Sequence, residues 1–487
     1  MTSKVAVSAD GTSGRPAAES IFAARYRITT VGVLLLMTII AFEALAVATA
    51  LPTAARSLHG LANYGWAFTG FLITSVIGMV VSGMRADRRG PRLPLGLGLL
   101  LFVGGLVVAG LADSMWLLVL ARVVQGFAVG LLITAMYVVM GEVYPDQVRP
   151  RMFAALSTAW IVPGLVGPTA AGWITEQLSW RWVFGGLAPF AALGGLLLLP
   201  AVRRLRSGCG DVHVAPSRVW FAVLTAVGIA GVAEAGQHQN PLSLGAGVFG
   251  LAAMLYGLYR LLPAGSGTFR AGVPAAVAFR GVLAGAFVGM EVLVPLTLTV
   301  QWHFRPTLAG LPLMLTAVAW AATSQIQGRS PQISKGSFVR MGLLLMAVAG
   351  VGMALVALRT VPGWAAFIFW PIAGGGAGFG ITTVSVALME YTTDAERGSD
   401  ASSLQLADSS GSAVTAAFSG ALVSLAAQGR ISYGGGFAVV FLTMAVLAAI
   451  ATVRAGRLRP PAGRPAIGGR SPVDARVATE AASGPVS

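Results

Sequence analysis

Three ionisable side chains interrupt long apolar runs of this sequence: Glu43, Arg122 and Glu291. In a run that crosses a membrane, a charged residue costs about 2.5–3.5 kcal/mol and normally faces a partner or water. Removal from water favours the neutral form of a carboxyl group, whereas a neighbouring arginine favours the ionised form. We therefore predict that Glu43 and Glu291 exchange protons during a conformational cycle, with Arg122 as the partner that tunes them. Static charge compensation is the alternative.

The three residues also lie at similar depth. Both glutamates lie about nine residues from the outer end of their apolar run, and Arg122 lies about seven residues from the same side. If the runs are helices, all three residues lie roughly 10–14 Å below the outer surface of the membrane. Three such groups at one depth are more than chance placement would give.

A charged stretch between two apolar runs is the next feature: Gly83-Met-Arg-Ala-Asp87-Arg88-Arg89-Gly90-Pro91-Arg92. It predicts a short loop between two helices. Gly83 would let a helix end approach its neighbour, and Gly90 permits a turn that a side chain would hinder. Asp87 can accept backbone N–H groups at the start of the next helix or pair with an arginine. A loop whose arginines only fix the orientation is the alternative.

Two glycine-containing runs predict close helix packing. After Arg122 come Gln125-Gly126 and then Gly130, so two glycines four residues apart share one helix face. An arginine that only extends outward from its helix end is the alternative. The second run is Pro163-Gly164-Leu-Val-Gly167-Pro168-Thr-Ala-Ala-Gly172, whose prolines and glycines predict a kinked helix with close neighbours.

Four further residues are candidates for lining a substrate cavity: Tyr137, Trp320, Gln325 and Trp370. Packing within the helix bundle is an equally good explanation for each of them.

The composition identifies an integral membrane protein. Of the 487 residues, 56% are hydrophobic and only 10% are charged, and the mean hydropathy is +0.77; a soluble protein has roughly 25% charged residues. The net charge of +15 does not indicate nucleic-acid binding, because the basic residues are spread over many loops. With Cys209 alone and four scattered histidines, we expect neither a disulfide nor a metal site.

The apolar runs predict an all-α protein with fourteen membrane-spanning helices, each about 20 residues long. The predicted spans are 30–52, 63–84, 93–113, 115–140, 152–175, 181–202, 218–236, 242–262, 274–300, 308–326, 340–358, 364–389, 403–427 and 434–454. Basic residues outside the spans are concentrated in the loops on one side of the membrane. The other side has only Arg56, Arg181, Arg305, Arg359 and Arg430. This asymmetry predicts that both termini are cytoplasmic.

The spans divide into a six-helix bundle, two linker helices and a second six-helix bundle. The predicted ranges are a flexible N-terminal tail 1–28, a first bundle 29–202, a basic loop with two linker helices 203–273, a second bundle 274–454 and a flexible C-terminal tail 455–487. Two six-helix halves built from inverted repeats are typical of secondary transporters.

Four of these motifs resemble those of the major facilitator superfamily, in particular its fourteen-span drug:proton antiporters. The stretch from Gly83 to Arg92 resembles the signature loop between spans two and three, which in that family stabilises one conformational state. Arg122, Gln125 and Gly126 match the span-four motif. Gly167-Pro168 and Gly172 match the span-five antiporter motif, although Pro163 and Ala171 replace glycines. Glu43, with the following Ala50-Leu51-Pro52, resembles the span-one motif, which usually has aspartate.

The resemblance implies a transporter in the cytoplasmic membrane that exports small amphipathic or lipophilic compounds in exchange for protons. It implies no enzymatic activity and no cofactor, because the proton gradient drives transport; the expected partners are the substrate, protons and lipid, and we expect a monomer. The alternatives are an exporter of an endogenous lipid or metabolite and a membrane sensor that does not transport. A primary ATP-driven pump is disfavoured, because no G-x-x-x-x-G-K-[ST] loop is present.

Overall fold

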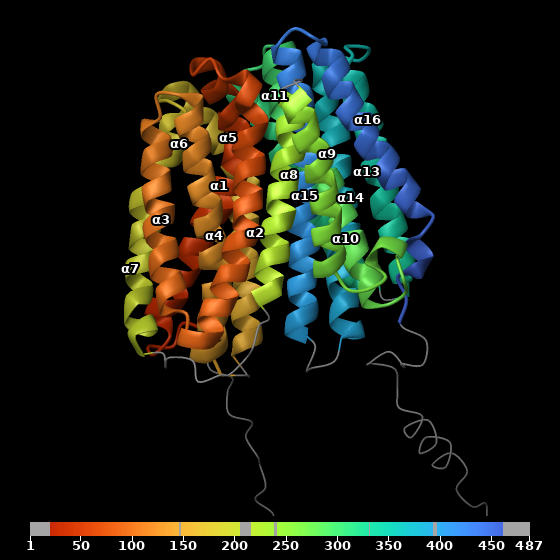
Figure 1. Cartoon of the computed structure of the whole chain (residues 1–487). Helices are drawn as coiled ribbons and strands as arrows, with labels where there is room; N and C mark the ends of the chain where they lie inside the picture. Colours follow the sequence, from red (N-terminus) through yellow and green to blue (C-terminus); the bar gives the residue numbers. More distant parts are fainter. Residues whose placement is uncertain are drawn as a thin grey trace, which may run out of the picture.

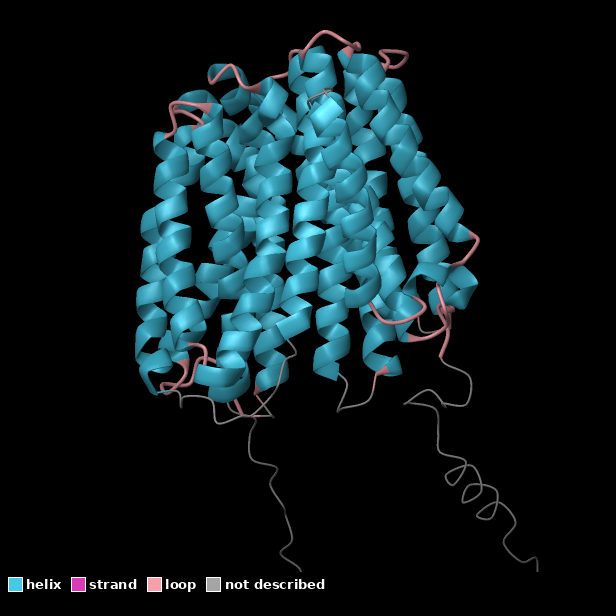
Figure 2. Cartoon of the chain, in the orientation of Figure 1, coloured by secondary structure: helices cyan, strands magenta, loops and turns pink. Residues whose placement is uncertain are grey.

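In a computed structural model of the chain, the described residues are 20–145, 148–204, 216–237, 241–330, 332–392 and 397–460. Within these ranges the chain forms helices joined by short loops and no strand (Figure 2). The helices run side by side and form a single bundle (Figure 1). We call the end at which α1 begins and α16 finishes the termini end, and the opposite end the far end.

The first half of the bundle corresponds to the predicted spans one to six. Its helices are α1 (Arg27–Ser57), α2 (Tyr64–Arg89), α3 (Arg92–Leu111), α4 (Met115–Val143), α5 (Arg149–Gln177), α6 (Arg181–Gly185) and α7 (Ala188–Arg204). The sixth span is therefore interrupted between α6 and α7. Pro189 lies in the first turn of α7, and because its ring would clash with the carbonyl group four residues earlier, it interrupts a continuous helix at this point.

The second half corresponds to spans nine to fourteen. Its helices are α10 (Val273–Glu291), α11 (Val294–Leu296), α12 (Pro306–Arg329), α13 (Lys335–Ala357), α14 (Ala366–Tyr391), α15 (Arg397–Ala427) and α16 (Tyr433–Thr452). Span nine is also interrupted: α10 ends at Glu291, the short α11 contains Pro295, and a π-helical turn, Thr297–Gln301, follows.

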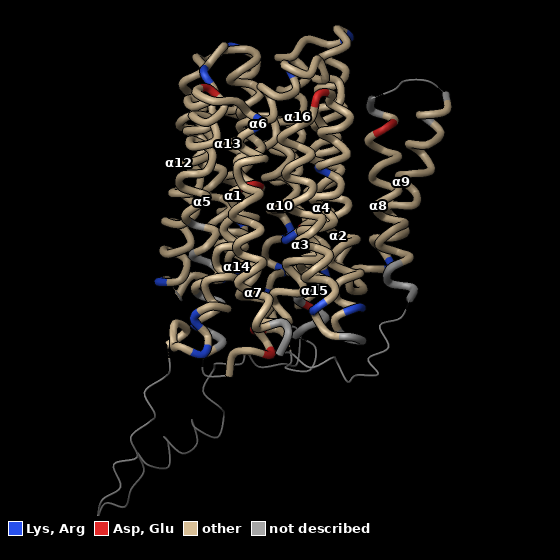
Figure 3. Tube along the Cα trace, turned by 90° about the vertical axis from the view of Figure 1, so that its left-hand side faces the viewer, with Lys and Arg blue, Asp and Glu red and all other residues tan. Residues whose placement is uncertain are grey.

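The two linker helices are α8 (Pro216–Gln237) and α9 (Pro241–Leu261). They pack closely on each other: a Cβ atom added to Gly228 would lie 2.6 Å from the carbonyl oxygen of Gly250. α8 lies against α2 of the first half and α15 of the second. Figure 3 shows the α8–α9 pair beside the other helices. The pair therefore covers one seam between the two halves, a role that the sequence did not predict.

The fourteen predicted spans are confirmed, with two of them interrupted. Among the described residues, 11 helices are long and apolar enough to cross a membrane, and α8 and α9 contain shorter apolar segments, Trp220–Ala235 and Gly245–Leu261. Of the predicted N-terminal tail 1–28, the structure describes residues 20–28. Residues 1–19 lie outside the described range, but Tyr26 is buried against Tyr144, with ring centroids 5.2 Å apart, and Thr30 donates a hydrogen bond to the carbonyl oxygen of Ile21.

Candidate functional site

Glu43 of α1 and Arg122 of α4 form a buried ion pair. The Nη1 atom of Arg122 donates a hydrogen bond to Oε1 of Glu43, and the two side chains are only 2% and 0% exposed. Arg122 also donates from Nη1 to Oε1 of Gln125 at 2.8 Å and from Nε to the carbonyl oxygen of Ala67 at 3.3 Å. Its guanidinium group lies 4.1 Å from the ring centroid of Phe71. The structure thus brings together two of the three predicted ionisable residues.

The pair is not fully satisfied by hydrogen bonds. The second carboxylate oxygen, Oε2 of Glu43, is buried without a hydrogen-bond partner, and so is the Nε2 atom of Gln125. An unpartnered buried carboxylate oxygen is costly, because removal of the group from water is not compensated. The unpartnered oxygen can therefore accept a hydrogen bond from a donor that the present contacts do not supply.

The glycines of α4 allow the approach that places Arg122 next to α2. A Cβ atom added to Gly126 would lie 2.1 Å from the carbonyl oxygen of Phe71, and one added to Gly130 would lie 2.1 Å from that of Ser75. Side-chain hydroxyls also link the two helices, because Ser82 donates to the carbonyl oxygen of Leu131 at 2.9 Å. The close helix packing predicted from Gly126 and Gly130 is confirmed.

Glu291 does not join this pair. It is the last residue of α10, is partly exposed, and has no hydrogen bond or ion pair with any residue that the structure describes. The N-terminal half meets α10 directly beyond it, since the hydroxyl group of Tyr64 donates to the carbonyl oxygen of Val292 at 2.9 Å. The predicted cluster of three ionisable residues is therefore a pair and a separate carboxylate.

The predicted cavity residues differ in accessibility. Trp370 is 0% exposed, which fits the packing alternative, and its ring stacks on Phe287, with centroids 5.2 Å apart. Trp320 is partly buried, and its ring lies edge-on to that of Phe287, with centroids 5.5 Å apart. Tyr137 is 45% exposed, and Gln325 is exposed near the termini end of α12.

The signature stretch is mostly helix rather than loop. α2 continues to Arg89, so only Gly90 and Pro91 connect it to α3, which begins at Arg92. Gly90 has φ 77° and ψ 172°, a conformation that side chains disfavour, as expected. The expected close approach at Gly83 is absent, because an added Cβ atom would meet no heavy atom within 4 Å. The side chains of Asp87 and Arg88 lie outside the described residues.

The span-five motif lies at the interface between the two halves. A Cβ atom added to Gly172 would lie 2.6 Å from the Cα atom of Thr307 in α12, and one added to Gly164 would lie 3.2 Å from Cβ of Ala317. Conversely, Gly310 of α12 lies against the carbonyl oxygen of Pro168. A Cβ atom added to Gly167 would instead lie 3.5 Å from the ring of Phe42 in α1, an ordinary contact distance. The motif thus links α1 to the second half.

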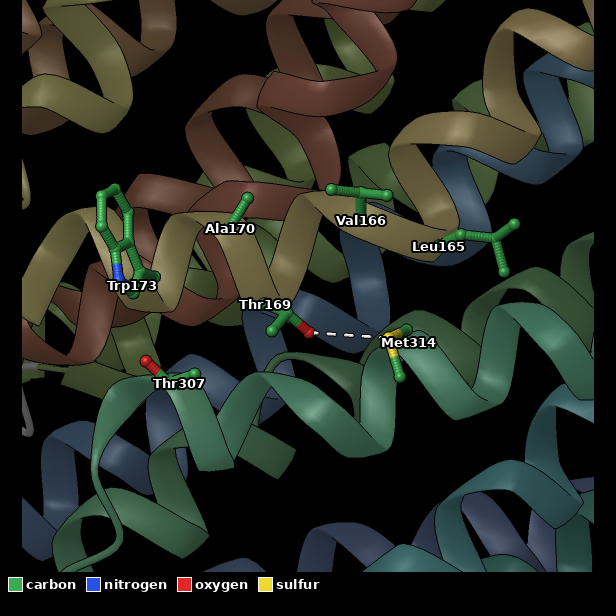
Figure 4. Close-up of a pocket in the computed structure, with 7 residues that line it drawn as sticks. All are labelled: Leu165, Val166, Thr169, Ala170, Trp173, Thr307 and Met314. Atoms are coloured by element: carbon green, nitrogen blue, oxygen red, sulfur yellow. Dashed lines mark hydrogen bonds between the residues drawn. The ribbon is translucent and has the colours of Figure 1, made fainter.

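A groove follows the α5–α12 interface. It has a volume of about 440 Å³ and an almost entirely apolar lining, with one interhelical contact between the Thr169 hydroxyl group and the Met314 sulfur at 3.7 Å (Figure 4). The lining residues are Leu165, Val166, Thr169, Ala170, Trp173, Thr307 and Met314. Trp173 is 54% exposed, which indicates that this groove opens on the outer surface of the bundle.

Sequence reasoning missed a second charged group within the helices. Nε of Arg280 in α10 donates to Oδ1 of Asp408 in α15 at 2.5 Å, and Nη1 donates to the hydroxyl oxygen of Ser385 in α14 at 3.0 Å. The position of Arg280 only two turns after the start of α10, opposite an acidic residue in another span, was the available signal.

The two halves meet at the far end of the bundle. The contacts there include Tyr64 with Val292, the close approach of Gly65 to Gly420, and a hydrogen bond from the backbone N–H of Thr307 to Oε1 of Glu176 at 2.6 Å. Towards the termini end, by contrast, the described part of α12 has no buried residue after Thr316. The bundle is therefore closed at the far end, and α12 is accessible at the termini end.

The chain is similar to curated multidrug transporters. Two relatives from Mycobacterium tuberculosis, each named “Probable multidrug-efflux transporter”, are 26% identical over 427 residues, which cover 83% of this chain and 89% of the relative. The multidrug transporter protein MdtP of Bacillus subtilis is 29% identical over 153 residues, covering 31% of this chain and 28% of the relative.

Solved structures share the fold at lower identity. A POT family transporter in complex with 5-aminolevulinic acid has a TM-score of 0.68 at 15% identity, covering 90% of this chain and 99% of that one. The xylose transporter XylE from E. coli, in a partially occluded inward open conformation, has a TM-score of 0.58 at 17% identity, with coverages of 91% and 99%. The family model of the Major Facilitator Superfamily matches residues 33–416, and the chain therefore belongs to this superfamily of transporters.

Proposed function

We propose that this protein exports small amphipathic or lipophilic compounds across the cytoplasmic membrane in exchange for protons. The observation that carries the proposal is the buried Glu43–Arg122 pair, in which one carboxylate oxygen has no partner. The multidrug-efflux names of the relatives from Mycobacterium tuberculosis support the substrate class. The crowding of basic residues at the termini end supports a cytoplasmic position for both termini.

Protonation of Glu43 would change the balance of the pair. A neutral carboxyl group no longer forms an ion pair with the Arg122 guanidinium. Other hydrogen-bond acceptors or water must then stabilise the positive charge of Arg122. Gln125 and the Ala67 carbonyl group already accept hydrogen bonds from Arg122 and are the nearest such partners. Proton binding therefore favours a different packing of α1 against α4.

The contacts of α1 offer a route from this pair to the interface between the halves. Phe42, next to Glu43, packs against Gly167 of α5, and α5 in turn packs against α12. α1 also meets α12 directly, since the methyl group of Thr49 would lie 3.2 Å from a Cβ atom added to Gly310. A shift of α1 on protonation is thus transmitted to the contacts that close the far end.

The test is transport by protein reconstituted in vesicles with an imposed pH gradient and no ATP. The wild-type protein is expected to move a fluorescent lipophilic dye against its concentration gradient, with protons moving the opposite way. Glu43→Gln should abolish the proton-driven component. The matched control is Glu142→Gln, a substitution of an exposed carboxylate in the same N-terminal half. Proton-driven transport at the wild-type rate by Glu43→Gln would refute the assignment.

An exporter of an endogenous lipid or metabolite is the second candidate, and the apolar α5–α12 groove favours it. The groove opens on the outer surface of the bundle between helices of different halves. A cell-envelope lipid defect in a deletion strain, together with no extrusion of any compound in a drug panel, would decide for this candidate.

A further inference from the structure

Exposed arginines are concentrated at the termini end of the second half, where α13 begins and α16 finishes. The two helices pack side by side and run in opposite directions (Figure 1). Among the described residues none of these arginines forms an ion pair, whereas Lys335, at the start of α13, is paired with Glu390. We call this group the arginine corner; its members are Arg340 of α13 and Arg454, Arg457 and Arg459, which follow α16.

The segment that follows α16 is fixed against α13. It forms a 3-10 turn, Ala455–Arg457, after which the backbone N–H of Leu458 donates to the carbonyl oxygen of Ala455 at 3.1 Å. Ala455 and Leu458 are only 0% and 3% exposed. The approach to α13 requires a glycine, because a Cβ atom added to Gly336 would lie 2.9 Å from the carbonyl oxygen of Ala455. The segment therefore carries its exposed arginines on a packed backbone.

The arginine corner has an excess of positive charge. Arg340 lies one turn beyond Gly336, about 6 Å along the axis of α13, and thus close to the packed segment. The first turn of α13 contains no acidic residue, so the positive end of the helix dipole adds to the charge of the arginines. Because like charges held close together repel each other, an anion bound among them would relieve this repulsion.

Two apolar stripes lead to the arginine corner. On α13 the exposed residues follow Arg340 at a spacing of four, and on α16 they precede Arg454, so each stripe continues into an arginine. α13 has 23 residues and is about 35 Å long, slightly more than the hydrocarbon core of a bilayer, so its first turns lie at a membrane surface. The exposed apolar residues are Leu344 and Val348 on α13 and Val446, Ile450 and Val453 on α16.

We propose that the arginine corner binds the phosphate group of an anionic phospholipid, whose acyl chains lie along the exposed stripes of α13 and α16. The planar guanidinium groups match the geometry of phosphate oxygens and can donate two hydrogen bonds each. A lipid fits better than a soluble phosphate compound, because the arginines are continuous with apolar surface that faces the bilayer. This lipid site lies outside the proposed transport cycle and does not depend on proton exchange at Glu43.

The experiment measures which lipid occupies the arginine corner. Val453→Cys, in a Cys209→Ser background, carries a fluorophore at a position that is 80% exposed. In phosphatidylcholine bilayers, quenching by brominated phosphatidylglycerol is compared with quenching by brominated phosphatidylcholine. We expect phosphatidylglycerol to be preferred about 5–25-fold, which corresponds to one or two arginines at about fivefold each. A label at Leu355→Cys, near the other end of α13, should show no preference.

Charge variants test the assignment of the arginines. Arg454→Gln should lower the preference for phosphatidylglycerol at the Val453→Cys label about fivefold, and Arg454→Lys should retain most of it. Arg27→Gln removes an exposed arginine at the same end of the bundle, in the first half, and should leave the preference unchanged. An unchanged preference in Arg454→Gln, or an equal loss in Arg27→Gln, would overturn the proposal, because the lipid would then respond only to the diffuse positive charge of this end.

Gly336→Ala tests the geometry of the corner without changing a charge. Its Cβ atom would displace the carbonyl group of Ala455 and the packed segment with it, so the preference for phosphatidylglycerol should fall. Gly328→Ala is the control near the end of α12, because an added Cβ atom there meets nothing within 4 Å. An undiminished preference in Gly336→Ala would contradict a site built by the packed segment. Displacement of the lipid by millimolar inorganic phosphate would instead identify a site for soluble anions and overturn the proposal.

Discussion

Glu176 of α5 and Thr307 of α12 join the two halves across the far end of the bundle: Oε1 of Glu176 accepts a hydrogen bond from the backbone N–H of Thr307 at 2.6 Å. Thr307 is the second residue of α12, where backbone N–H groups have no partner within the helix and the helix dipole favours a negative charge. The contact therefore stabilises the conformation that is closed at the far end.

Glu176→Ala should shift the population towards conformations that are open at this end. Spin labels on cysteines introduced at the exposed far-end residues Ser57 and Thr360, in a Cys209→Ser background, report the separation of the halves. We expect a new population at longer distance, because loss of a charged hydrogen bond costs about 1.5–3 kcal/mol. Glu142→Ala, at the other end of the first half, should leave the distances unchanged; an identical distribution for Glu176→Ala would contradict the prediction.

Gly126→Ala should destabilise the first half strongly. Its Cβ atom would lie 2.1 Å from the carbonyl oxygen of Phe71, so α2 and α4 must move apart, which typically costs about 1–3 kcal/mol in a packed interior. Thermal unfolding in detergent measures the effect. Gly141→Ala is the control on the same helix, because nothing lies within 4 Å of its added Cβ atom; it should be neutral or stabilise the helix by up to about 1 kcal/mol.

Gly90→Ala should impair the turn between α2 and α3. At φ 77° and ψ 172° an alanine is strained by about 1–3 kcal/mol, and a lowered thermal unfolding midpoint is expected. Gly83→Ala in the same signature stretch meets open space and should leave the midpoint unchanged or slightly raised. Equal effects of the two substitutions would mean that the strained turn contributes nothing to stability.

The Glu43–Arg122 pair allows stability and transport to be separated. Removal of one partner leaves an uncompensated buried charge, so Arg122→Gln alone should lose about 3–5 kcal/mol of unfolding free energy, whereas the double variant Glu43→Gln/Arg122→Gln should recover most of it. The double variant is nevertheless expected to lack proton-driven transport in vesicles. Recovery of both properties would make the pair a structural feature only.

Different parts of the site were predictable to different degrees. Gly126 and Gly130 predicted close packing correctly, because the main effect of two glycines on one helix face is to let a neighbouring helix approach. Gly83 was misread, because the same residue type at a helix end does not reveal whether a neighbour is present. For Trp370 the sequence left cavity lining and packing equally open, because it places an aromatic residue on a helix but does not say towards which neighbour the ring turns; in the structure the ring is buried.

The amino-acid sequence was enough to establish the class of protein, the number and order of the spans and the presence of ionisable residues within them. Length and hydrophobicity of a segment are local properties, and a bilayer requires each crossing segment to satisfy its own backbone hydrogen bonds. Tertiary structure alone decided that Arg122 pairs with Glu43 while Glu291 has no cationic partner among the described residues, and that α8 covers the seam of the two halves. The rotation and neighbours of a membrane helix follow from packing against distant segments, which no single span encodes.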